Sequence, residues 1–229
     1  MEKTMAFSYN QLLMIAFLQG YDGIVGLPEF QAENSAEIIL REVNALVNGG
    51  FLRTDGDKFV CTDITAVIGE KLGGSKEYIA IHTVNSSVPD FSCYPGKSLM
   101  MCTPRRVSPD TASIRFLSAD ELFVLLRDEG YVPDIDESLE PDEKKLEQYE
   151  AEYLYRFDPN RPLDENGCVL FSAEMIDNKG NSKGFVKVIS YYFYKYILTF
   201  CNGELKRSRL CAAEFDNAMK GLICSNDNS

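Results

Sequence analysis

Histidine is the residue that most often performs acid–base chemistry, and it is sparse in this chain. Its single histidine, His82, lies in an apparent strand, KEYIAIHTV, in alternation with Ala80 and Val84. That position is typical of a partly buried structural histidine rather than a catalytic base. A Ser–His–Asp or Cys–His–Asn unit would depend on His82 alone, and no G-x-S-x-G nucleophile motif occurs. The sequence therefore selects no catalytic residue.

Metal and phosphate sites are not indicated either. The C-x-x-C, H-E-x-x-H and D-x-D-x-D-G patterns are absent, so we expect no metal site and no cofactor. Gly20, Gly23 and Gly26 form G-x-x-G-x-x-G, but without a P-loop lysine or a preceding strand they indicate a loop. The seven cysteines lie mainly in apolar stretches. This pattern favours reduced, buried thiols in a cytoplasmic protein over a disulfide framework.

The composition is that of an acidic globular protein. The 229 residues are 45% hydrophobic and 25% charged, which is ample material for a core. The net charge of −12 argues against a protein that draws its affinity from nucleic-acid phosphates, and it fits protein partners. Neither a secretory signal nor an uncharged run of about 20 apolar residues is present, so we expect a cytoplasmic protein without membrane insertion.

The N-terminal segment is predicted to be helical. Helices over 9–19, 34–48 and roughly 63–72 surround a short hairpin with an Asp-Gly turn at 54–57. Two helices followed by a small hairpin are also the order of a winged-helix DNA-binding module. Its expected recognition helix carries only Arg41 as a positive charge, whereas phosphate-contacting helices are richer in Lys and Arg. A DNA-binding regulator is therefore disfavoured.

The remaining chain contains one order of elements twice. Residues 76–129 are expected to form three strands, with a loop around Pro89 and Pro95, and a helix opened by the capping box Ser118–Glu121. Three pairs of segments are similar in the same order: Ser75–Ile81 and Ser182–Val188, Lys97–Cys102 and Lys195–Cys201, Leu117–Leu122 and Leu210–Phe215. We therefore predict an α+β fold of two pseudo-symmetric β-β-β-α halves on an antiparallel sheet, with an N-terminal helical segment.

An acidic segment separates the two halves. Residues 131–166 are rich in Asp, Glu and Pro, and their middle, 142–155, is predicted to be helical. The acidic residues favour a solvated face over a specific site. We accordingly divide the chain into 1–130, the linker 131–166, and 167–229.

The densest run of β-branched and aromatic residues is KGFVKVISYYFYKYILTFC at 183–201. Its length indicates two strands with a bend near Ser190. Alternation places Tyr191, Phe193 and Lys195 on one face, which combines aromatic anchors with a cation as protein-docking surfaces do. Burial of both faces under helices is the alternative. Tyr191, Phe193 and Lys195 are the candidate partner-binding residues.

Four stretches together resemble one protein family. They are ALVNGGFL, DITAVIGEKLGG leading into YIAIHTV, RFLSADELFVLL, and its echo RLCAAEFDNAMKGLI. Their succession over nearly the whole chain resembles the EspG family, the cytosolic chaperones of type VII (ESX) secretion. The resemblance implies two pseudo-symmetric halves on a sheet and a non-enzymatic adaptor that holds an aggregation-prone secretion substrate. No catalytic residues are implied by it.

The composition departs from the family in one respect. The chain is cysteine-rich and acidic, unlike the actinobacterial pattern, so its partner could be a WXG100-like or LXG-like helical hairpin instead of the usual heterodimer. A second class of function stays open. The chain could be a small-molecule-binding or hydrolytic domain with a pocket between the halves.

Overall fold

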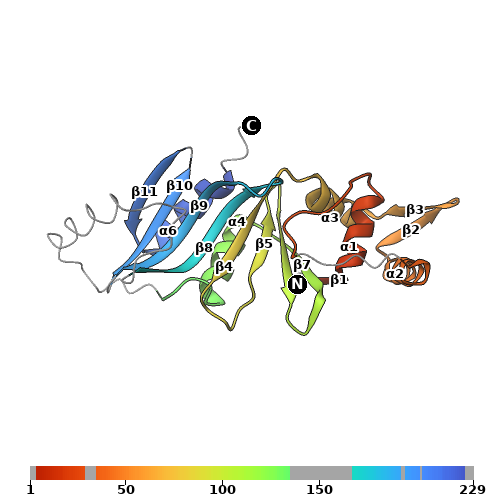
Figure 1. Cartoon of the computed structure of the whole chain (residues 1–229), viewed down its shortest axis with the longest axis horizontal. Coiled ribbons are helices and arrows are strands. Elements are labelled where there is room, and N and C mark those ends of the chain that lie inside the picture. The colour runs from red at the N-terminus through yellow and green to blue at the C-terminus, as the bar shows by residue number, and fades with distance from the viewer. Residues whose placement is uncertain (1–3, 29–34, 135–166, 192–193, 202, 225–229) are drawn as a thin grey trace. The chain divides into compact units, whose positions relative to one another are not determined.

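The computed structural model describes residues 4–28, 35–134, 167–191, 194–201 and 203–224 (Figure 1). The fold is α+β with a large antiparallel sheet, which confirms the predicted class. The strands of this sheet are β1 (Met5–Ser8), β4 (Glu77–Thr83), β5 (Phe91–Tyr94), β6 (Leu99–Arg105), β7 (Ser108–Leu117), β8 (Gly167–Asp177), β9 (Ser182–Tyr191), β10 (Tyr194–Cys201) and β11 (Glu204–Arg209). They hydrogen-bond in the order β1-β7-β6-β5-β4-β8-β9-β10-β11.

The chain forms two compact units, and each unit is made of three separate segments of the sequence. The first comprises residues 1–81, 89–122 and 175–182, and the second comprises 82–88, 123–174 and 183–229. Four elements contribute residues to both units, namely β4, β8, β9 and the helix α4 (Ala119–Asp128). The helix predicted over 142–155 lies outside the described residues.

The helices and the hairpin near the N-terminus agree with the sequence prediction, whereas the strand β1 before them was not predicted. The predicted elements are α1 (Tyr9–Phe17), α2 (Ala36–Asn48), the hairpin of β2 (Leu52–Asp55) and β3 (Lys58–Cys61), and α3 (Asp63–Gly74). Ser8 and Gln11 form a capping box at the start of α1, and the Ser35 hydroxyl accepts from the Ile38 amide at the start of α2. The hairpin turns at Gly56, whose φ of 59° favours glycine.

The core of the first unit lies where α1 and α3 meet the sheet. Leu12 and Ile15 of α1 and Ile68 of α3 are completely buried. Thr65 is buried with them, and its hydroxyl donates to the Phe51 carbonyl at 2.7 Å. Since buried polar groups are costly unless they are hydrogen-bonded, this bond allows α3 to pack with a threonine on its inner face.

In the second unit, α6 (Ala212–Cys224) buries Phe215, Met219 and Leu222. The Phe215 ring meets Phe171 of β8 edge to face at 5.4 Å between centroids. Two polar contacts join α6 to α4: Arg127 pairs with Asp216, and the Lys220 ammonium lies 5.8 Å from the centre of the Phe123 ring. Apolar and charged contacts therefore hold α6 in place.

Each series of strands before a helix has four members instead of the predicted three. The order is β4-β5-β6-β7-α4 and then β8-β9-β10-β11-α6. Two of the three similar segment pairs join elements with equal places in these series, β6 with β10 and the start of α4 with the start of α6. The third, Ser75–Ile81 with Ser182–Val188, joins β4 to β9 and is one strand out of step. Sequence duplication itself stays a prediction.

The additional strand, β5, was predicted to be a loop between Pro89 and Pro95. Its residues Phe91–Tyr94 are all buried and pair with both β4 and β6. Because the strand is buried on both faces, it lacks the alternation that marks a half-exposed strand. Pro89 and Pro95 lie just before and just after the strand, so they mark its ends and not a continuous loop.

Candidate protein-docking groove

Helix α1 carries more apolar side chains than its contact with the core requires. Leu12, Ile15 and Ala16 are buried. Phe17 is 51% exposed, and Leu18, which caps the helix, is 43% exposed. Isolated exposed hydrophobic residues are common on proteins, but several together on one short helix mark an interaction surface.

Helix α2 shows a similar surplus. It buries only Glu42 and Leu46, whereas Ile39 is 41% and Leu40 is 61% exposed. Its strongly amphipathic sequence predicts that the isoleucines face a core. They lie instead on the side of α2 that is turned toward α1 and β3.

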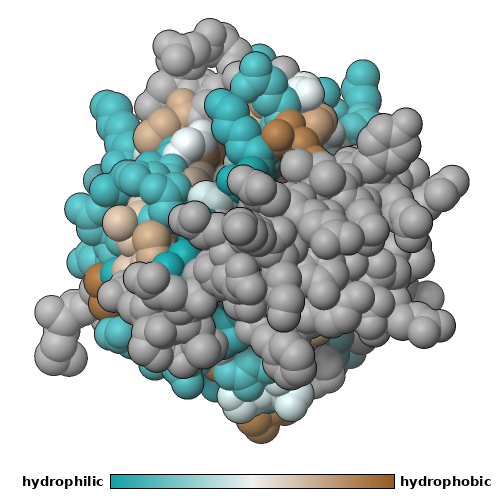
Figure 2. Space-filling view, turned by 90° about the vertical axis from the view of Figure 1, so that its left-hand side faces the viewer, coloured by the Kyte–Doolittle hydropathy of each residue, from teal (hydrophilic) through white to brown (hydrophobic). Residues whose placement is uncertain are grey.

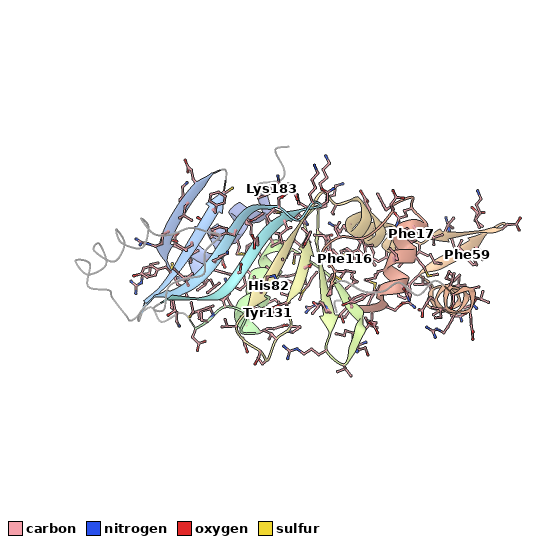
Figure 3. The ribbon with its side chains drawn as sticks, viewed as in Figure 1. Phe17, Phe59, His82, Phe116, Tyr131 and Lys183 are labelled. Atoms are coloured by element: carbon pink, nitrogen blue, oxygen red, sulfur yellow. The ribbon has the colours of Figure 1, made fainter. Side chains whose placement is uncertain are left out.

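Between these elements lies an apolar groove of about 350 Å³. Figure 3 shows Phe17 on α1 and Phe59 on β3 in the same region. The groove is lined by Asn10, Leu13, Met14, Phe17, Leu18, Ile38, Ile39, Glu42, Val43 and Phe59. We call it the α1–α2 groove. All of its described lining residues belong to the first unit.

Among the described lining residues, Glu42 is the only charged one. One of its carboxylate oxygens accepts from Arg41 Nη2 at 2.8 Å, and the other accepts from the Ser8 hydroxyl at 3.3 Å. Its side chain is 11% exposed, whereas that of Arg41 is 68% exposed. The groove therefore combines an apolar lining with one fixed carboxylate.

The predicted partner-binding residues lie elsewhere, at the connection between β9 and β10. Tyr191 ends β9 and pairs with Tyr194 in the ladder, and Phe193 lies outside the described residues. Lys195 is half-buried, and its ammonium donates to the Asp134 carbonyl at 2.7 Å. Because the side chains of Tyr191 and Phe193 lie outside the described part of the structure, this site stays a prediction.

The alternative, burial of both faces, holds further along β10. The neighbouring residues Ile197 and Leu198 point to opposite faces and are both completely buried. The face drawn in Figure 2 is on the side of β11 in Figure 1. Its described residues are mainly hydrophilic, and the apolar ones form small separate groups.

The expected position of the single histidine is wrong. His82 is exposed, whereas Ile79, Ala80 and Ile81 before it are all buried. The strand is covered on both faces at 79–81 and reaches the surface at its end, so alternation with Ala80 does not hold.

Metal chemistry has no evident site in the part of the chain that the structure describes, and of the seven cysteines only Cys93 and Cys102 are buried, so the expectation of buried thiols holds for these two alone. No group of three or more His, Cys, Asp or Glu residues there could hold a metal ion. Burial raises the pKa of Cys102 to about 12 and that of Cys93 still higher, which disfavours the reactive thiolate. None of the described helices is long and apolar enough to cross a membrane.

The glycine-rich stretch is a loop, as predicted, and it is held by side chains of β5. Tyr94 donates its hydroxyl to the Val25 carbonyl at 2.5 Å, and Ser92 donates to the Gly26 carbonyl. At Gly26, with φ of 74°, a β-carbon would lie only 2.7 Å from the Tyr94 oxygen. These contacts give the loop a structural role.

Comparison with known proteins gives a structural likeness only. No family model and no curated protein matches the sequence. Among solved structures, the chain is similar to the Mycobacterium tuberculosis type VII secretion system chaperone EspG5, determined in complex with a PE25–PPE41 dimer. The TM-score is 0.54 at 11% identity, over 95% of each chain. The chain has an EspG-like fold.

The EspG-like fold was anticipated from the sequence, but the α1–α2 groove was not. A signal was present, since 9–19 and 36–48 hold more apolar residues than one buried stripe can use. Periodicity alone does not show which of these apolar residues stay exposed.

Proposed function

We propose that this chain is a non-enzymatic cytoplasmic adaptor or chaperone that binds a helical protein substrate of a type VII-like secretion system. The observation that carries the proposal is the EspG-like fold with an exposed apolar groove on its N-terminal helices. Contiguous exposed apolar surface of this kind marks protein interaction sites. The structural neighbour is itself a chaperone whose complex contains a protein dimer.

The partner that we propose is a WXG100-like or LXG-like helical hairpin. The acidic net charge of −12 and the seven cysteines depart from the actinobacterial pattern, and this departure is the reason for proposing a partner other than the usual heterodimer. A small-molecule-binding or hydrolytic domain is the alternative proposal. The two make different predictions about what accompanies the purified protein.

Affinity capture of the tagged full chain from its native host tests the proposal. We expect one helical secretion protein in a stoichiometric complex, measured by mass spectrometry and size-exclusion chromatography. An unrelated protein of similar size and charge, carrying the same tag, is the control. Absence of any such partner, together with a bound metabolite in native mass spectra, would favour the small-molecule alternative.

The residues Tyr191, Phe193 and Lys195 are proposed as a second contact for the same partner. Aromatic anchors carry much of the free energy of protein interfaces, so Tyr191→Ser with Phe193→Ser should weaken capture by more than about 2 kcal/mol. The affinity for the captured partner and the circular dichroism of the double variant would be measured together. Aggregation of the variant would instead identify these residues as core.

A further inference from the structure

We propose that the α1–α2 groove takes one amphipathic helix of a partner protein, with an apolar stripe of about two turns and basic residues beside it. This inference rests on the proposed function and names the docking site and the chemistry of its occupant. It is argued from the spacing of the lining residues, their exposure and their charge.

The spacing of the lining residues selects a helix as the occupant. Helix α1 contributes Asn10, Leu13, Met14, Phe17 and Leu18, which are positions i, i+3, i+4, i+7 and i+8 and so form one continuous face. Helix α2 contributes two further pairs, Ile38 with Ile39 and Glu42 with Val43. Two adjacent helical faces leave a groove into which the side-chain ridges of a third helix pack.

The length of the groove limits the contact. From Asn10 to Leu18 the axis of α1 rises by about 12 Å, at about 1.5 Å for each residue. A bound helix would therefore contact the groove over roughly two turns, with apolar residues at i, i+3, i+4 and i+7. Phe59 on β3, 40% exposed, adds an aromatic contact at the wall.

The charge of the groove decides which residues are favoured beside the apolar stripe of the bound helix. The described lining has one fixed carboxylate, Glu42, and no cation, and α1 has no charged residue at all. Arg41 offsets this carboxylate in part, but the whole chain carries −12. Lysine or arginine beside the apolar stripe is therefore favoured, and acidic residues are repelled.

The same charges argue against a second copy of this chain as the occupant. Two-fold pairing through the groove would bring Glu42 of both copies into one interface and two chains of −12 together. A basic helix meets no such repulsion.

The test uses a fluorescent synthetic helix of roughly four turns, with leucine on one face and lysine on the other. Two matched probes carry glutamate in place of lysine, or the same composition without the helical pattern. Fluorescence anisotropy with the full chain measures their affinities. We expect the lysine helix to bind at least about tenfold more tightly than either matched probe.

Groove variants locate the binding. Phe17→Ser with Phe59→Ser should lower the affinity for the lysine helix at least about tenfold, because the bound helix would bury both rings. Val124→Ser is the matched control, since Val124 is 48% exposed on α4 and does not line the groove. Should the double variant melt early, Ile39→Ser replaces it. Glu42→Gln should narrow the preference for lysine over glutamate.

Several results would overturn the inference. The first is equal affinity of the lysine helix for the groove variants and for the parent chain. The second is equal affinity of the parent chain for the lysine and glutamate helices. The third is a concentration-dependent dimer of the chain that Phe17→Ser with Phe59→Ser abolishes. The two proposals fail separately. A captured secretion partner that ignores the groove variants overturns this inference alone, whereas lysine-helix binding without any captured partner overturns only the proposed function.

Discussion

Gly26 illustrates how a residue that suggests ligand chemistry can serve the fold. Its φ of 74° costs a side-chain-bearing residue free energy, and a β-carbon there would also lie 2.9 Å from the Tyr78 ring. We expect Gly26→Ala to lower the free energy of unfolding by roughly 1–3 kcal/mol, measured by urea denaturation. Gly23→Ala is the matched control, because nothing lies within 4 Å of the added carbon. Equal stability of the two variants would show that the loop is not fixed by β5.

Predictions for single residues succeeded or failed according to whether the sequence pattern contains the information that they need. Spacing distinguished the glycine loop from a P-loop, because a phosphate site needs a lysine and a preceding strand. Alternation failed for His82, because a period of two gives the correct face only where one side of the strand is solvated. Exposure at the end of a doubly buried strand depends on the neighbouring elements.

The start of α4 offers a test at the scale of one element. The Glu121 carboxylate accepts from the Ser118 amide at 2.7 Å and from its hydroxyl at 2.8 Å, and the Ser118 hydroxyl accepts from the Glu121 amide. The backbone hydrogen bond, followed by that from the hydroxyl, lowers the pKa of Glu121 from its ordinary value of 4.5. The ionised carboxylate therefore stabilises the folded state more than the unfolded state.

The sign of the pH dependence follows from this lowered pKa. The contribution of Glu121 is complete above its unfolded pKa, and it is lost as the pH falls through the lower folded value. We expect the stability gap between the parent chain and Glu121→Gln to narrow in that acidic range, as measured by thermal unfolding at a series of pH values. Ser118→Ala should cost about 1 kcal/mol near neutral pH through loss of the cap. A gap for Glu121→Gln that is constant with pH would contradict the ionic capping box.

Elements were predictable where local chemistry defines them. The capping box at Ser118 located α4, and the amphipathic period located the other helices. One of the three segment pairs of the predicted repeat, β4 with β9, is one strand out of step, because apolar strands resemble each other when β-branched and aromatic residues recur. The missing strand, β5, has four residues between two prolines, which is too short to show a period.

At the scale of the whole molecule, the α1–α2 groove could not have been found from periodicity. An apolar stripe predicts that a helix face is covered, but it does not say by which element, or whether by another protein. On α1 and α2 the described chain leaves Phe17, Ile39 and Leu40 exposed. This surplus is visible only when the elements that cover each helix are known.

The distribution of charge gives a final prediction about the winged-helix alternative. The helix and hairpin that would contact DNA carry Arg41, Arg53 and Lys58, but also Glu42 and a further set of acids, namely Glu37, Asp55 and Asp57. Arg41 is already paired with the Glu42 carboxylate at 2.8 Å. A duplex binder instead needs several cations free to neutralise phosphates.

We therefore expect no shift of duplex DNA by the full chain at low salt, where phosphate contacts are strongest. An electrophoretic mobility assay measures this, with a basic winged-helix domain as the positive control. The DNA-binding alternative would be restored by a measurable affinity at low salt that meets two conditions. It would fall steeply as salt rises, and it would be lost in the variant Arg41→Ala with Arg53→Ala. Arg209→Ala is the matched control, because Arg209 lies on β11, outside this module. The net charge of −12 adds a general repulsion of the phosphate backbone to this scarcity of cations, which is the reason that we expect no binding.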